Sequence, residues 1–264
     1  MSRTQNGTFN DTQLQAVNAF TEAQSLLEVM LMKFHAVERK SGDPFFLRVV
    51  IAGKSNGNAS HSVGLYLPKL LDTTVETSEN LLSEEKGAMI KPSGLLIDYG
   101  TYFIQLLEGV ERHIVLFLRL LEKHCAQEEE ASCYDVRILY LVDDVSPSMS
   151  TSFLYTDKIP AMSTGDEIQE KTEEEVANMI MEDVHNLMKL SDIVASEPSN
   201  KHKLLLDSVR VTHPLLFPRI SSIRTYLGGD LCLTLSEYVD VFGKIPVVTR
   251  DVELNHPVEC PLKY

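Results

Sequence analysis

Gln105 is the residue of this sequence whose type and position most directly suggest binding chemistry. It lies in the stretch SGLLIDYGTYFIQLLEG, residues 93–109, where it interrupts an apolar run. An amide both donates and accepts hydrogen bonds, so it could hold a planar molecule between two helices. Alternatively it is a structural residue satisfied by backbone or by a neighbouring side chain, since a bare buried amide costs about 1 to 3 kcal/mol.

A phosphate-binding loop is suggested by Gly53, Lys54 and Ser55, which follow an apolar run. The full motif needs another glycine five residues before Gly53, and Arg48 stands there. Backbone amides cannot wrap a phosphate without that loop. We therefore predict no nucleotide site.

Two histidines and four cysteines could bind a metal only at suitable spacings. His113 and His124 are eleven residues apart, which does not make a ligand pair, so we predict surface residues. The cysteines show no close pair and are expected to be reduced structural thiols. We predict no metal site; the cysteines are Cys125, Cys133, Cys232 and Cys260.

The acidic runs 128–130 and 173–175 have the pattern of solvated faces rather than of acid–base pairs. The sequence contains no HExxH motif. We therefore predict no catalytic residue and expect a protein that is not an enzyme.

The formal net charge of −14 argues against direct binding to nucleic acid or to an anionic membrane, because both need clustered Lys and Arg. A charged partner should therefore be basic. The first ten residues are polar where a signal peptide is apolar, and no apolar run approaches the roughly 18 residues of a membrane span. We expect a cytoplasmic protein.

Hydrophobic periodicity predicts the elements that must position these residues. Tyr99 and Gly100 separate two apolar runs as the turn of a hairpin, because glycine adopts a positive φ readily. The acidic segment 73–90 is either an exposed helix or an inserted loop. The patterns predict helices over residues 11–38, 61–72 and 110–124, strands over 45–53, 134–142 and 151–159, and a hairpin over 94–108.

In the second strand of the hairpin, Phe103, Gln105 and Leu107 share one face, and the alternate residues share the other. The order strand, helix, hairpin, helix, strand, strand predicts an α+β fold. We expect a ferredoxin-like sandwich in which a mixed sheet carries two helices on one face.

The C-terminal part has a helical pattern. Two capping boxes, Thr172 with Glu175 and Thr234 with Glu237, begin predicted helices, and residues 201–211 form another between them. We predict an N-terminal amphipathic helix over residues 1–43, an α+β domain over 44–162, and an α-helical region with an extended tail over 163–264.

The hairpin and the following helix resemble the core of BLUF domains, which are flavin-binding blue-light sensors. The resemblance extends more weakly from Phe45 to about Met162. It implies the sandwich fold derived above and a flavin read by a glutamine at Gln105. The residues that fit the pattern are Ser93, Gly94, Phe103, Gln105, Leu107, Glu108, Gly109 and His124.

The resemblance also implies two partners for that glutamine, a redox-active tyrosine and an asparagine. In a register without gaps they fall on Ile51 and Gly87. Neither replacement can do the same chemistry, so we expect no cofactor and interpret Gln105 as a remnant. A flavin-binding sensor module that uses Gln105 is the alternative.

With its long first helix and the stretch LGGDLCLTLSEYVDVFGKIP, residues 227–246, the chain as a whole resembles the testis-expressed protein 47 family. The resemblance implies expression in male germ cells and a role in the sperm flagellum or another cilium. We expect a protein-interaction component whose amphipathic helices place some apolar stripes against another chain. Contact with axonemal microtubules should be indirect or pass through a basic patch of Lys33, Arg39, Lys40, Arg48 and Lys54, because both surfaces are acidic.

Overall fold

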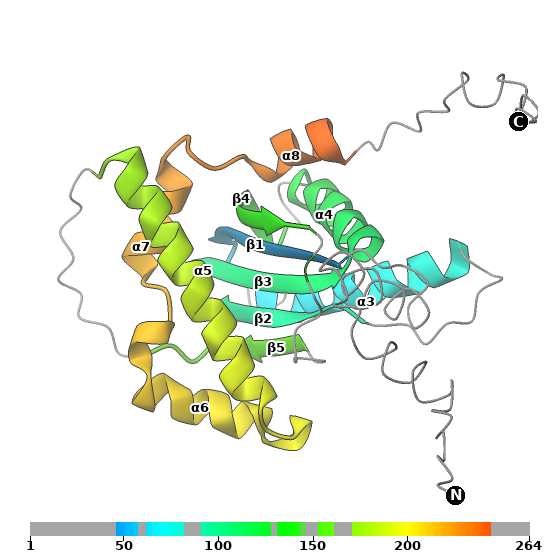
Figure 1. The fold of residues 1–264 in the computed structure, drawn as a ribbon. Coiled ribbons are helices and arrows are strands. Elements are labelled where there is room, and N and C mark those ends of the chain that lie inside the picture. Colours follow the sequence, from blue (N-terminus) through cyan, green and yellow to red (C-terminus); the bar gives the residue numbers. More distant parts are fainter. Residues whose placement is uncertain are drawn as a thin grey trace, which may run out of the picture. The chain divides into compact units, whose positions relative to one another are not determined.

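Five strands form one mixed sheet in the computed structural model. The structure describes residues 46–57, 62–81, 91–127, 131–143, 145, 153–160 and 171–243. The strands are β1 (Phe46–Ser55), β2 (Ser93–Asp98), β3 (Tyr102–Val110), β4 (Cys133–Val142) and β5 (Phe153–Thr156). Their order is β4-β1-β3-β2-β5 (Figure 1). β5 pairs with β2 in parallel, and the other pairs are antiparallel.

Two helices, α3 (Val63–Leu81) and α4 (Glu111–Cys125), pack on one face of this sheet. Each connects two strands, which together with the strand order gives the ferredoxin-like α+β sandwich that the sequence predicts. Pro68 lies near the N-terminal end of α3. Through its continuation to Leu81, α3 makes the first part of the acidic segment helical, while residues 82–90 lie outside the described residues.

The hairpin between β2 and β3 turns at Tyr99 and Gly100, as predicted. Gly100 has a φ of 83°, which glycine adopts without strain. The Asp98 carboxylate accepts a hydrogen bond from the Gly100 amide at 2.8 Å, and the Tyr99 amide donates to the Tyr102 carbonyl at 2.8 Å. These contacts fix the register that places Gln105 opposite Ile51 and Leu96.

The first three of the four C-terminal helices cover the opposite face of the sheet (Figure 1). Val184, Leu187 and Leu190 on the longest of them share a core with Ile104 and Leu106 of β3. The expectation that such stripes face another chain is therefore wrong for these residues. The helices are α5 (Glu173–Ala195), α6 (His202–Thr212), α7 (Ile220–Gly228) and α8 (Leu235–Phe242), with 3-10 turns η2 (Ser199–Lys201) and η3 (Pro214–Leu216).

Both predicted capping boxes are confirmed, at the starts of α5 and α8. The sequence did not predict α7. The last helix, α8, lies on the first face, where Leu235 and Tyr238 join the core of α3 and α4. The C-terminal region therefore passes around the β4 edge of the sheet.

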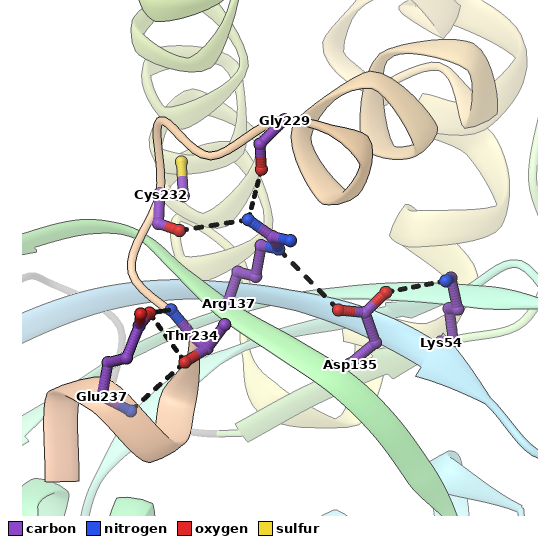
Figure 2. A network of polar contacts seen from close by, with 7 residues as sticks. All are labelled: Lys54, Asp135, Arg137, Gly229, Cys232, Thr234 and Glu237. Carbon is purple, nitrogen blue, oxygen red and sulfur yellow. Dashed lines mark hydrogen bonds and ion pairs between the residues drawn. The ribbon is translucent and has the colours of Figure 1, made fainter. Parts of the chain in front are cut away.

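Arg137 on β4 holds this passage in place (Figure 2). Its guanidinium donates to the carbonyls of Gly229 and Cys232, which lie between α7 and α8. Asp135 accepts from Lys54 at 2.7 Å, and this hydrogen bond raises the Lys54 pKa. The edge strand is therefore covered rather than open to pairing with another chain.

The N-terminal helix predicted over residues 11–38 lies outside the described residues. The described elements belong to one unit, which also includes the C-terminal helices. The boundaries after residues 43 and 162 stay predictions.

Candidate functional site

Gln105 lies in the middle of β3 with its side chain fully buried. Phe103 and Leu107, two residues away on each side, belong to the core under α3 and α4, so the Gln105 side chain points to that face. Neither its amide nitrogen nor its oxygen has a hydrogen-bond partner in the described part of the chain. The amide is therefore either the remainder of a binding site or an uncompensated polar group.

The cross-strand neighbours of Gln105 are aliphatic. Ile51 on β1 and Leu96 on β2 stand directly opposite, and both are 0% exposed. Neither side chain can donate an electron or a hydrogen bond. The structure thus places Ile51, the residue at the tyrosine position of the resemblance, opposite Gln105, whereas Gly87 lies outside the described residues.

Replacing Gln105 by methionine is expected to stabilise the protein. Methionine has a similar length and flexibility, and it removes a buried amide that has no hydrogen-bond partner among the described residues. The free energy of unfolding in urea should rise by about 1 to 2 kcal/mol, within the desolvation penalty of one polar group.

Gln127→Met is the matched control, because Gln127 is exposed in a turn. It should leave the unfolding midpoint unchanged. Destabilisation of the Gln105→Met variant would contradict the interpretation of this amide as uncompensated.

A cavity of about 240 Å³ lies on the other face of the sheet, between the strands and α5. Arg48 and Glu108 line it as an ion pair: the Glu108 Oε2 atom lies 2.6 Å from Arg48 Nη2 and accepts from Arg48 Nε at 2.8 Å. Glu108 is a motif residue, yet it lies on the face opposite Gln105. The lining residues are Arg48, Ser93, Gly94, Leu106, Glu108, His185, Met188, Lys189, Ser191 and Asp192.

The ion pair that lines this cavity links two strands of the sheet. The side chains of Arg48 and Glu108 are 20% and 6% exposed, so both charges are largely withdrawn from water and must be paired. A guanidinium stays protonated in proteins and cannot serve as a base. Arg48 thus joins β1 to β3 and reaches the Met188 sulfur of α5 at 3.4 Å.

Two members of the predicted basic patch, Arg48 and Lys54, already form ion pairs within the chain. Arg48 is bound to Glu108, and Lys54 is bound to Asp135. The other predicted members, Lys33, Arg39 and Lys40, lie outside the described residues.

His113 is buried, and its prediction as a surface residue is wrong. It stands four residues before Phe117 and eight before Leu121, on the apolar stripe of α4. His124 is partly exposed, and its ring stacks on Tyr66 of α3 with centroids 3.7 Å apart. Nowhere in the described residues do three His, Cys, Asp or Glu side chains gather as a metal site would require.

The carboxyl of Asp183 on α5 is a partly buried titratable group that sequence patterns did not single out. Burial raises its pKa to about 6, although the Tyr226 hydroxyl donates to it at 2.6 Å. The folded protein therefore holds this proton more tightly than the unfolded chain between about pH 4 and pH 6. Stability from this group is present below pH 4 and is lost as the pH rises through 6.

Asp183→Asn should remove the loss of stability that occurs as the pH rises. The side-chain oxygen of the asparagine can still accept the hydrogen bond from the Tyr226 hydroxyl. The stability of the variant relative to the parent protein is expected to rise by about 2 kcal/mol between pH 4 and pH 7. Urea unfolding at a series of pH values measures it. Asp230→Asn, at an exposed position, is the control; a constant difference between parent and Asp183→Asn would contradict the prediction.

The fold is that of a ferredoxin-like α+β protein with helices on both faces of the sheet. Among the described helices none is both long and apolar enough to cross a bilayer. The family profile of Testis-expressed protein 47 matches residues 48–244, and the chain belongs to that family. The match extends from β1 to the end of α8.

Solved structures of BLUF proteins are similar to the chain at low identity. The BlrP1 BLUF structure is 14% identical, with 62% of this chain and 88% of that chain covered and a TM-score of 0.29. BlsA in its photo-activated state is 17% identical, with 63% of this chain and 95% of that chain covered and a TM-score of 0.27. A Klebsiella pneumoniae BlrP1 complex with calcium and cy-diGMP is 15% identical, with 64% of this chain and 34% of that chain covered and a TM-score of 0.26. A search of curated proteins gives no match.

Proposed function

We propose that this protein is a non-catalytic interaction or structural component of male germ cells, built on a BLUF-like domain that has lost its flavin chemistry. The observation that carries the proposal is the pairing of Gln105 with Ile51 and Leu96. Photochemistry of the kind that the family resemblance implies needs an electron donor beside the glutamine. An aliphatic residue at that place cannot supply one.

The proposed setting is the cytoplasm, including the sperm flagellum. The family name supports expression in the testis. The net charge of −14 favours a basic protein partner over nucleic acid or an anionic membrane. An acidic microtubule surface would then be reached through such a partner rather than directly.

A docking surface for a basic protein is supported by α6 and the following 3-10 turn. Leu204 and Val211 are each 72% exposed and lie seven residues apart, on one face of the helix, and Leu215 is 78% exposed. Exposed apolar side chains of this kind mark contact sites when polar groups surround them. Asp207, between them, is paired with Lys158 Nζ at 2.6 Å, so the exposed apolar side chains carry the proposed contact.

The partner proposal can be tested by purifying the tagged full-length chain from testis extract and repeating the purification with Leu204→Ser/Leu215→Ser. We expect a basic protein that the parent chain retains, that the variant loses, and that dissociates as salt is raised. Leu65→Ser, at an exposed residue of α3, is the control. Recovery of the same proteins with the parent chain, the double variant and the control would contradict the proposal. So would a parent chain that elutes as a dimer without any partner protein.

A flavin-binding sensor is the second candidate, and the unpaired Gln105 amide is the observation that favours it. Equilibrium dialysis of the purified full-length protein against flavin mononucleotide separates the two functions. The interaction protein should show no saturable uptake, in the parent as in Gln105→Met. Uptake of one flavin per chain that Gln105→Met abolishes would establish the sensor.

A further inference from the structure

Two cysteines that are separate in the sequence pattern meet in the structure. Cys125 is the last residue of α4 and Cys133 is the first residue of β4. Their sulfur atoms lie 3.8 Å apart, in van der Waals and hydrogen-bonding contact. Their spacing of eight matches no zinc or CxxC motif, so the sequence pattern did not indicate this contact.

Contacts on both sides of the turn hold the two sulfur atoms together. The Ser132 amide donates to His124 Nε2 at 2.9 Å. Asn56, just after β1, donates from its side chain to the Ala131 carbonyl and from its backbone to the Ser132 carbonyl, both at 3.0 Å. The start of β4 is thus fixed relative to the end of α4.

The two thiols differ in access. Cys125 is partly exposed, whereas Cys133 is buried. The hydrogen bond with Cys125, together with burial, raises the pKa of the Cys133 thiol well above its ordinary value. A soluble oxidant therefore meets Cys125 first, and Cys133 stands behind it as a protonated thiol.

We propose that Cys125 and Cys133 are a modification site at which a low-molecular-weight disulfide, such as oxidised glutathione, forms an intramolecular disulfide. The Cys125 thiolate attacks one sulfur of the oxidant and releases one glutathione thiolate, leaving a mixed disulfide on Cys125. Cys133 then loses its proton to solvent and attacks Cys125 Sγ, which expels the second glutathione as a thiolate. The two cysteines lose two electrons, and oxidised glutathione takes up both.

The geometry suits the second step. The sulfur atoms need to approach from 3.8 Å to about 2 Å, which calls for rotation of the two side chains toward each other. The new bond would link α4 covalently to β4, next to the stack of His124 on Tyr66 that joins α4 to α3. This inference is independent of the partner and of any flavin.

The sequence offers a direct assay. Trypsin cuts after Lys123 and Arg137 and so leaves both cysteines in one peptide, residues 124–137. The full-length folded protein is equilibrated with oxidised and reduced glutathione, free thiols are alkylated in denaturant, and the peptide is weighed. We expect an unalkylated peptide that is lighter than the reduced peptide by two hydrogen atoms. Its abundance should exceed that of the glutathionylated peptide at least about tenfold, because the neighbouring thiol has the higher effective concentration.

A second digestion locates the bond. A protease that cuts after Glu128, Glu129 or Glu130 separates the cysteines, so the two fragments should stay joined until a reductant is added. In Cys133→Ser the peptide should instead retain one glutathionyl group on Cys125. In Cys125→Ser, Cys133 should stay reduced because it is buried. Circular dichroism verifies that both variants are folded.

Two results would overturn the proposal. One is a parent peptide that takes two alkyl groups after equilibration while the Cys133→Ser protein is glutathionylated at Cys125. The other is a glutathionyl group that persists on Cys125 of the parent protein.

Discussion

Removing the Glu108 side chain is expected to destabilise the protein by about 3 kcal/mol, because it leaves the Arg48 guanidinium in a largely buried place without its counter-ion. Both close contacts of Arg48 go to one oxygen of Glu108, at 2.6 and 2.8 Å. Urea unfolding of Glu108→Ala, followed by circular dichroism, gives the change in the free energy of unfolding.

Arg48→Met/Glu108→Leu is the informative companion of this variant. It removes both charges and fills the space with apolar groups, so its stability should come within about 1 kcal/mol of the parent protein. A double variant as unstable as Glu108→Ala would show that the loss comes from packing rather than from the unpaired charge.

Gly94→Ala is expected to cost at least about 3 kcal/mol, at the upper end of what overpacking costs. A Cβ atom on Gly94 would lie 2.1 Å from the Leu106 carbonyl oxygen and 3.1 Å from the Leu107 Cα atom. Both are backbone atoms of the paired strand β3, so the strands would have to separate. Thermal and urea unfolding should both show the loss.

Gly228→Ala is the control for this glycine. Apart from its chain neighbours and the backbone of its own helix, no described atom lies within 4 Å of the added Cβ, so the stability of this variant should stay within about 1 kcal/mol of the parent protein. If Gly94→Ala proved as stable as this control, the close approach of β2 and β3 at Gly94 would be refuted.

The fold was predictable where local signals were strong. Gly100 marked the hairpin, and the Thr172 and Thr234 capping boxes marked the starts of α5 and α8, since turn and cap geometry depend on neighbouring residues alone. The face of Gln105 followed from strand alternation. These features need no knowledge of distant contacts.

The missed features depend on contacts between distant segments. The helix α7 is short, with polar residues between Ile223 and Tyr226, and its burial comes from packing against the sheet and α5. The coverage of the second sheet face by the C-terminal helices is a tertiary arrangement that periodicity does not encode. Periodicity shows that a stripe is apolar, without showing what covers it.

The same limit applies to the candidate sites. The spacing of eight between Cys125 and Cys133 crosses a helix end and a strand start, so it matches no single-element pattern. His113 could have been placed in the core, because it precedes Phe117 and Leu121 at helical spacing. The ion pair of Arg48 with Glu108 joins residues 60 apart and had no local signal.

The absorption spectrum of the full-length protein, purified natively and without added cofactor, tests the central claim most directly. A chain whose Gln105 stands among aliphatic neighbours should give a colourless, monodisperse solution, and denaturation should release no flavin. Visible flavin bands at one isoalloxazine per chain would contradict the account.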